Sequence, residues 1–191
     1  MSVRLQEIHP SVVHFPIALL PTALGLDAIG RATDNQGLMN AGRALMPVAA
    51  ASAVVSAAAG LLAQGALRYP DETGRELLVT HRNTNAVLTI GAIALAALRW
   101  RREKPSNAYL AAGLGSLAAL GYSASLGGKM VYEHGLGVKP AGGLIEERAP
   151  EIAPGQLGHA AKMAAADTAE GTRQSVASLK DGEIAPELRP V

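Results

Sequence analysis

Four apolar stretches follow one another along the chain up to Gly128. They cover Val12–Ile29, Ala44–Leu67, Thr84–Leu98 and Asn107–Gly128. A helix needs about 20 apolar residues to cross the hydrocarbon core of a bilayer, with about 17 as the usual lower limit. The third stretch is shorter than that limit, and it reaches the required length when His81–Asn83 are included. The pattern therefore predicts four membrane spans.

These stretches favour helices over strands, because they are rich in Ala and Leu and because a single open sheet leaves backbone groups unsatisfied in lipid. A soluble four-helix bundle is the alternative, but it needs polar faces at helical spacing, and Ala44–Leu67 has none. A cleaved signal peptide is the alternative for the first stretch. It lacks a basic segment close to the apolar run and a small-residue cleavage site before Asp27, so we expect it to be retained.

The connections between the stretches are short, which predicts antiparallel neighbours in an all-α, up-down-up-down transmembrane bundle. We expect this domain to cover residues 1–138, with helices at about 11–30, 43–67, 81–99 and 107–129. After Lys139-Pro140 the composition changes to Glu, Asp, Pro, Gly and Ala. We expect residues 139–191 to form a polar tail outside the membrane. Its Ala-rich part, Gln156–Leu179, is either a surface helix that docks on a partner or disordered.

Composition limits the chemistry that the chain can perform. It is 49% hydrophobic and 17% charged, with a net charge of +1 and no cysteine. A chain without a strong positive field is not expected to bind nucleic acid. The lack of cysteine excludes disulfides, thiolate metal sites and covalent c-type haem. Any metal chemistry must therefore rest on His, Met, Tyr or carboxylate side chains.

Basic residues predict the orientation of the bundle. The connection after the third stretch contains Arg99, Arg101, Arg102 and Lys104, and the connection after the first contains Arg31 and Arg43. Lys and Arg at helix ends mark the cytoplasmic side. We therefore expect a multi-pass protein of a bacterial inner membrane with both termini in the periplasm. For Asp27, near the end of the first stretch, a local ion pair with Arg31 is the simplest expectation.

Four of the five histidines are predicted to meet at one membrane level. His9 and His14 lie at the start of the first helix, His81 precedes the third helix, and His134 follows the fourth. In an up-and-down bundle these positions share one side. Ionisable groups at the edge of the hydrocarbon core are costly, and they usually have a function. For any one of these residues, a histidine that hydrogen bonds to backbone or lipid headgroup is the alternative.

Neutral imidazole binds zinc, copper and haem iron. Two imidazoles on facing helices would supply both axial positions of a b-type haem, and His14 with His81 is the first choice for this pair. His9 and His134 would form a second pair, or would contact haem propionates together with Arg82 and Lys129. Several small residues would line a slot for the haem, although they serve plain helix packing equally well: Gly25, Gly91, Ala94, Gly113 and Gly121.

Two motifs resemble those of a known family. HPSVVHFPIAL at His9–Leu19 and GGKMVYEHGLGV at Gly127–Val138, together with the His81-Arg82 pair, are similar to the predicted membrane proteins called domain of unknown function 2231. The resemblance covers about residues 8–138. It implies a four-helix membrane domain of bacteria that is sometimes encoded near, or fused to, redox proteins such as c-type cytochromes or quinoprotein dehydrogenases.

Three functions remain open at this point. The first is a haem b subunit that passes electrons from a periplasmic donor to the quinone pool or another membrane carrier. The second is a cofactor-free structural or anchoring subunit that holds a partner protein of a membrane complex through the tail. The third is a membrane protein that binds copper or zinc through the histidines, with His14 and His81 as ligands. No P-loop, G-x-S-x-G or H-E-x-x-H motif is present, so we expect an electron-transfer or structural subunit rather than an enzyme.

Overall fold

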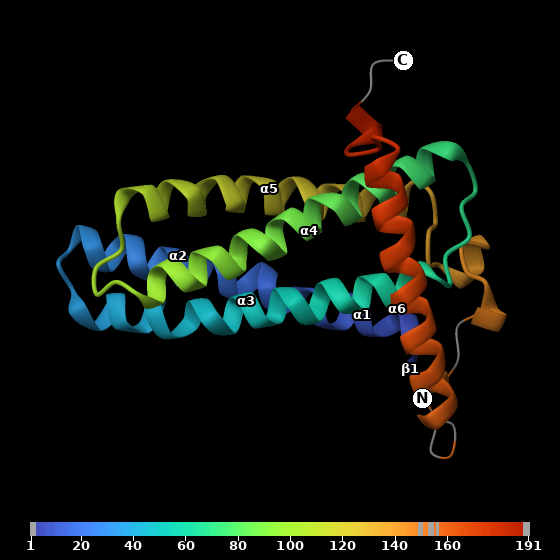
Figure 1. Ribbon diagram of the computed structural model, residues 1–191, viewed down its shortest axis with the longest axis horizontal. Helices are drawn as coiled ribbons and strands as arrows, with labels where there is room; N and C mark the ends of the chain where they lie inside the picture. The colour runs from blue at the N-terminus through green and yellow to red at the C-terminus, as the bar shows by residue number, and fades with distance from the viewer. Residues whose placement is uncertain (1–2, 149–150, 153–154, 156, 189–191) are drawn as a thin grey trace. The chain divides into compact units, whose positions relative to one another are not determined.

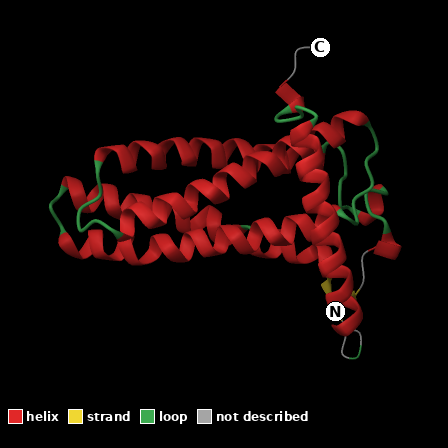
Figure 2. Ribbon diagram, viewed as in Figure 1, coloured by secondary structure: helices red, strands yellow, loops and turns green. Residues whose placement is uncertain are grey.

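The protein is all-helical apart from one short pair of strands, as the computed structural model shows for residues 3–148, 151–152, 155 and 157–188 (Figure 2). The α-helices are α1 (Ile8–Val12), α2 (His14–Ala32), α3 (Gln36–Gln64), α4 (Glu72–Trp100), α5 (Asn107–Tyr132) and α6 (Leu157–Lys180). Short 3-10 helices cover Leu5–Glu7, Lys139–Ala141, Glu146–Arg148 and Pro186–Leu188. The strands β1 (Val3–Arg4) and β2 (Glu151–Ile152) pair antiparallel. The predicted all-α class is confirmed.

The chain forms two compact units. We call Val12–Ser56 with Asn85–Tyr122 the bundle unit, and Met1–Ser11, Ala57–Thr84 and Ser123–Val191 the terminal unit. In the bundle unit, α2, α3, α4 and α5 lie side by side (Figure 1). Its core is built mostly from small and unbranched side chains: Leu20, Ala23, Leu24, Met46, Ala49, Ala50, Ala53, Ala92, Leu95 and Tyr109. Small residues at helix contacts let the backbones approach closely.

The outer surface of the bundle unit is apolar. Every helix exposes large hydrophobic side chains, among them Phe15 and Ile29 on α2, Val55 on α3, Ile90 on α4 and Leu114 on α5. An exposed apolar surface that extends over several helices is typical of a membrane or protein interaction surface. By length and composition, three segments of the described residues can cross a membrane: Leu5–Ala32, Gln36–Gln64 and Asn107–Tyr132. The fourth expected span, within α4, is not among them.

Two helices begin well before their expected starts. Helix α3 starts at residue 36 instead of about 43, and α4 starts at residue 72 instead of about 81. Capping side chains explain both starts, because Asn35 Oδ1 accepts the Leu38 N–H at 3.1 Å and Asp71 Oδ1 accepts the Gly74 N–H at 2.7 Å. Polar residues interrupt the first turns of both helices, Gln36, Asn40 and Arg43 in α3 and Glu72, Arg75 and Glu76 in α4, so a search for continuous apolar stretches places the starts too late.

The first expected helix is divided into α1 and α2 at Val13. Pro16 has no N–H, so it cannot donate to the Val12 carbonyl as a residue four positions later in a helix would. The Ser56 hydroxyl of α3 donates to that carbonyl instead, at 3.2 Å. A side chain of a neighbouring helix thus satisfies the backbone group that the proline leaves without a partner.

The terminal unit contains the ends of α3 and α5, the N-terminal half of α4, and α6. Single backbone bridges join Leu67 to Leu144 and Leu136 to Gly143, so the segment after α5 lies along the segment after α3. Gly135 and Gly137 have positive φ angles of 62° and 75°, which glycine adopts without strain. The glycines of the GGKMVYEHGLGV motif therefore shape the turn that follows α5.

We predict that Gly113→Ala lowers stability while Gly115→Ala, two residues further along α5, does not. A Cβ added at Gly113 would overlap Leu24 Cδ2, whereas one added at Gly115 meets nothing within 4 Å. Overpacking costs about 1–3 kcal/mol, and replacing glycine by alanine inside a helix gains up to about 1 kcal/mol. Thermal unfolding in detergent, followed by far-UV circular dichroism, measures both variants. A Gly113→Ala protein as stable as Gly115→Ala would contradict the observed packing.

Candidate functional site

Two histidine rings of the terminal unit each pack against a helical glycine. His9 on α1 lies against Gly60 of α3, where an added Cβ would be 3.3 Å from its Cε1 and Nδ1 atoms. His81 on α4 lies against Gly127 of α5, where an added Cβ would be 3.4 Å from its Cε1 atom. Both histidines belong to the terminal unit, but they pack against different helices, α3 and α5. The convergence of the histidines on one cofactor stays a prediction.

The hydrogen bond of His81 fixes which of its nitrogens carries the proton. His81 Nδ1 is 2.9 Å from the Ser123 carbonyl oxygen and 3.2 Å from the hydroxyl of the same residue. A carbonyl oxygen can only accept, so the shorter contact requires a proton on Nδ1. The lone pair of the neutral ring then lies on Nε2. Histidine ligands of metals are oriented by the same kind of bond.

The other two candidate histidines have different surroundings. His134 is half-buried in the terminal unit, and its Nδ1 lies 3.3 Å from Asp71 Oδ2. His14 belongs to the bundle unit, where it is the first residue of α2 and is exposed. His9 and His14 are five positions apart, but the helix break at Val13 lies between them. They therefore belong to different units.

The two candidate cations, Arg82 and Lys129, contact the C-terminal tail. Arg82 donates from Nη2 to the Ser178 hydroxyl of α6 and from Nη1 to Gln64 Oε1 at 3.4 Å. Lys129 Nζ lies 3.7 Å from Glu187 Oε1. Both cations therefore bind residues of the C-terminal tail, Ser178 and Glu187, within the terminal unit.

The N-terminal half of α4 binds the segment after α6 through polar side chains. The Asn83 amide donates to the carbonyl oxygens of Glu183 and Ile184, both at 2.9 Å, and buried Thr80 accepts the Glu187 N–H at 3.2 Å. Arg75 forms a two-point ion pair with Glu183. Hydrogen bonds to Glu183 and Glu72 raise the pKa of Arg75 above its ordinary value. The sequence shows that the N-terminal half of α4 is polar, but it does not show that these side chains bind the segment after α6.

A second polar cluster lies buried inside the bundle unit. Asp27 and Arg99 are both inaccessible to solvent, and Arg99 Nε lies 2.9 and 2.8 Å from the two carboxylate oxygens of Asp27. Tyr109 donates to Asp27 Oδ2 at 2.9 Å, and Arg99 Nη2 donates to the Met39 carbonyl at 2.6 Å. The expected ion pair between Asp27 and Arg31 is wrong, because Arg31 donates instead to the Pro105 carbonyl. Asp27 and Arg99 are 72 positions apart, so no local sequence pattern identifies them as partners.

Two cavities of the described residues are lined by residues other than histidine. One groove of about 470 Å³ is lined by Pro47, Ala96, Ala97, Trp100 and Arg101, and a polar cleft of about 330 Å³ lies beside α6. Neither is lined by a histidine. Within residues 3–148, 151–152, 155 and 157–188, no group of three or more His, Asp or Glu side chains is placed to hold a metal ion.

Long apolar helices with an outward-facing hydrophobic surface, three of them candidate spans, together with one ion pair that is fully buried, are typical of a membrane protein. The chain belongs to the family of predicted membrane proteins DUF2231, whose model matches residues 6–140. This confirms the resemblance of the two motifs. No curated protein and no solved structure matches the chain.

We predict that Arg99→Gln strongly destabilises the protein, because it leaves the Asp27 carboxylate buried without its partner. Removing one member of a buried pair costs about 3–5 kcal/mol. Arg102→Gln makes the same charge change at an exposed position and is expected to alter stability by less than about 0.5 kcal/mol. Denaturant unfolding in detergent measures both. Adding Asp27→Asn to Arg99→Gln should recover part of the loss, and an additive double variant would speak against the pair.

Proposed function

We propose that this protein is a membrane-embedded electron-transfer subunit that binds haem b, with His81 and His9 as the residues that would hold the iron. The observation that carries the proposal is the bond from His81 Nδ1 to the Ser123 carbonyl, because a bond of this kind orients histidine ligands and places the lone pair of the neutral ring on Nε2. His9 is chosen as the second ligand because its ring lies in the same unit as His81 and, like it, packs against a helical glycine. It takes the place of His14, which is exposed on α2.

The residues present fit a haem rather than a zinc or copper site. A haem iron needs only two protein ligands, whereas structural zinc takes four and catalytic zinc three. Gly60 and Gly127 let two helix backbones approach the imidazole rings, which supports the orientation of both rings. Bound haem b would supply a centre that accepts and donates one electron. Arg82, Lys129 and His134 would hold its propionates, and the two cations would then exchange their contacts with the tail.

We also propose that all four long helices cross the membrane. Helix α4 exposes Val87, Ile90, Ile93 and Leu98, and the described residues between Asn83 and Leu98 include no charged side chain. This apolar face supports α4 as a fourth span although its N-terminal half is polar. With four crossings, both termini lie on one side, and the basic connections after α2 and α4 make that side the periplasm of a bacterial inner membrane.

A cofactor-free anchoring subunit is the second candidate. The observation that favours it is that neither of the two cavities described above is lined by a histidine. In this function the histidines are structural, and the tail presents its exposed apolar side chains, among them Leu157, Val176, Leu179 and Ile184, to a membrane-complex or redox protein. The haem experiment below separates the two candidates.

The purified protein is predicted to show a Soret band and split α and β bands in a reduced-minus-oxidised spectrum. His81→Gly and His9→Gly should lose the split bands, and added imidazole should restore them because it replaces the missing side chain. His14→Ala and His159→Ala, both at exposed positions, serve as controls that keep the spectrum. A wild-type protein without these bands, after expression with added haem precursor, would favour the anchoring subunit.

The proposed orientation predicts that alkaline phosphatase fused after Val191 is active, because this reporter folds only in the periplasm. The same reporter inserted in the connection after α4, at Glu103, should be inactive. Equal activity at both positions would mean that Glu103 and the fused C-terminal end lie on the same side, which would contradict the proposed single crossing by α5. The measurement is independent of haem and tests α5 and the tail directly.

A further inference from the structure

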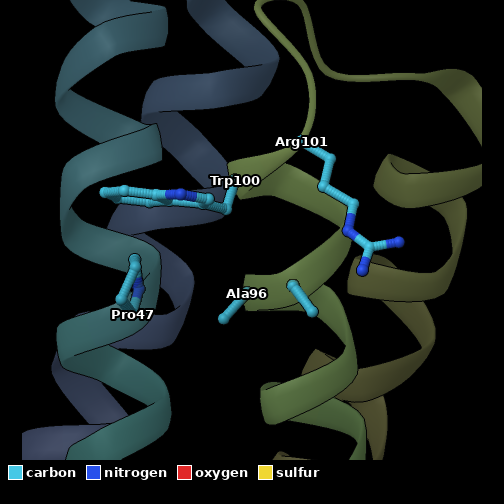
Figure 3. Close-up of a pocket in the computed structure, with 5 residues that line it drawn as sticks. Pro47, Ala96, Trp100 and Arg101 are labelled. Atoms are coloured by element: carbon cyan, nitrogen blue, oxygen red, sulfur yellow. The ribbon is translucent and has the colours of Figure 1, made fainter.

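An open groove lies on the outer surface of the bundle unit between α3 and α4. Its volume is about 470 Å³, and it is lined by Pro47 of α3 and by Ala96, Ala97, Trp100 and Arg101 of α4. Figure 3 shows the Trp100 ring reaching from the end of α4 toward α3 above Pro47, while the Arg101 side chain leaves the same helix end in the other direction. The small residues of α4 leave a hollow that the tryptophan ring closes at one end.

The lining is suited to a hydrocarbon chain. Pro47, Ala96 and Ala97 carry no polar side-chain atom, and the Trp100 side chain is 60% exposed. Tryptophan is enriched where a membrane span meets the interface, because its ring is apolar and its N–H is polar. The groove therefore runs from the level of the lipid headgroups at Trp100 into the level of the acyl chains at Ala96.

Positive charge borders the headgroup end of this groove. Arg43 Nη2 donates to the Trp100 carbonyl at 2.7 Å, and its guanidinium carbon lies 5.6 Å from the centroid of the Trp100 ring. Arg101 is exposed. Arginine N–H groups are strong donors to phosphate oxygens, and each basic residue near an anionic membrane surface contributes about 1 kcal/mol of attraction.

We propose that this groove is a binding site for one anionic phospholipid. An acyl chain lies along Pro47, Ala96 and Ala97 beneath the Trp100 ring, and Arg43 and Arg101 bind the phosphate and the negative headgroup. The complementary charge is what selects an anionic lipid over a zwitterionic one. The site rests on the proposed membrane crossing of α4, and it is independent of haem.

Trp100 is the only tryptophan of the chain, so its fluorescence reports on this groove alone. The full-length protein is reconstituted in phosphatidylcholine nanodiscs that contain rising fractions of phosphatidylglycerol with brominated acyl chains, which quench tryptophan on contact. A parallel series contains brominated phosphatidylcholine. We expect half-maximal quenching at an about fivefold lower fraction of the anionic lipid. Equal quenching by both lipids would overturn the site.

Variants test the two parts of the site separately. Arg101→Gln should remove much of the preference for phosphatidylglycerol, and Arg102→Gln, the same change one residue later, should keep it. Ala97→Phe fills the groove and should reduce quenching by either lipid, while Ala118→Phe, at an exposed position of α5, should not. Preference retained in both Arg101→Gln and Ala97→Phe would refute the site.

The same experiment separates this site from the proposed membrane crossing of α4. If neither brominated lipid quenches Trp100 in the wild type, both the site and that crossing fail. If both lipids quench equally, the crossing stands and the selective site fails. The haem spectrum of the same sample is unaffected by either outcome.

Discussion

The ion pair between Asp27 and Arg99 is the interaction on which the arrangement of the bundle unit depends. It joins α2 to the C-terminal end of α4, and its remaining hydrogen bonds reach α3 through the Met39 carbonyl and α5 through the Tyr109 hydroxyl. A charge in this position has no solvent to stabilise it, so each polar atom needs a partner of fixed geometry. Apolar packing of alanines and methionines is tolerant of small shifts, whereas this cluster is not. It therefore specifies which helix faces meet.

The sequence predicted the helices well and their polar contacts poorly. Apolar runs such as Ala44–Leu67 are properties of a segment alone, so they are visible without a structure. The starts of α3 and α4 were missed because Asn35 and Asp71 cap first turns in which polar residues interrupt the apolar pattern. The partner of Asp27 was missed because Arg99 is 72 positions away, while Arg31 is close in sequence and offered a plausible local pair.

The sequence indicates which helix ends carry the candidate histidines, but it does not indicate what their side chains contact. Connectivity places His9, His14, His81 and His134 at the same level of an up-and-down bundle, and this argument needs no geometry. It cannot distinguish His9 from His14, because that choice depends on the break in the helix at Val13 and on the missing N–H of Pro16. The bond between His81 and the Ser123 carbonyl involves a backbone atom, which no sequence pattern identifies.

The contacts between α4 and the segment after α6 have a consequence for how the protein is made. The ribosome synthesises Arg82 and Asn83 about a hundred residues before their partners Ser178 and Ile184. During that interval Arg82 Nη2 and the Asn83 amide lack these two partners, although Arg82 Nη1 can already bond to Gln64 Oε1. The polar contacts of this half of α4 are therefore completed only after the segment that contains Ser178 and Ile184 has left the ribosome, which makes them a late step in assembly.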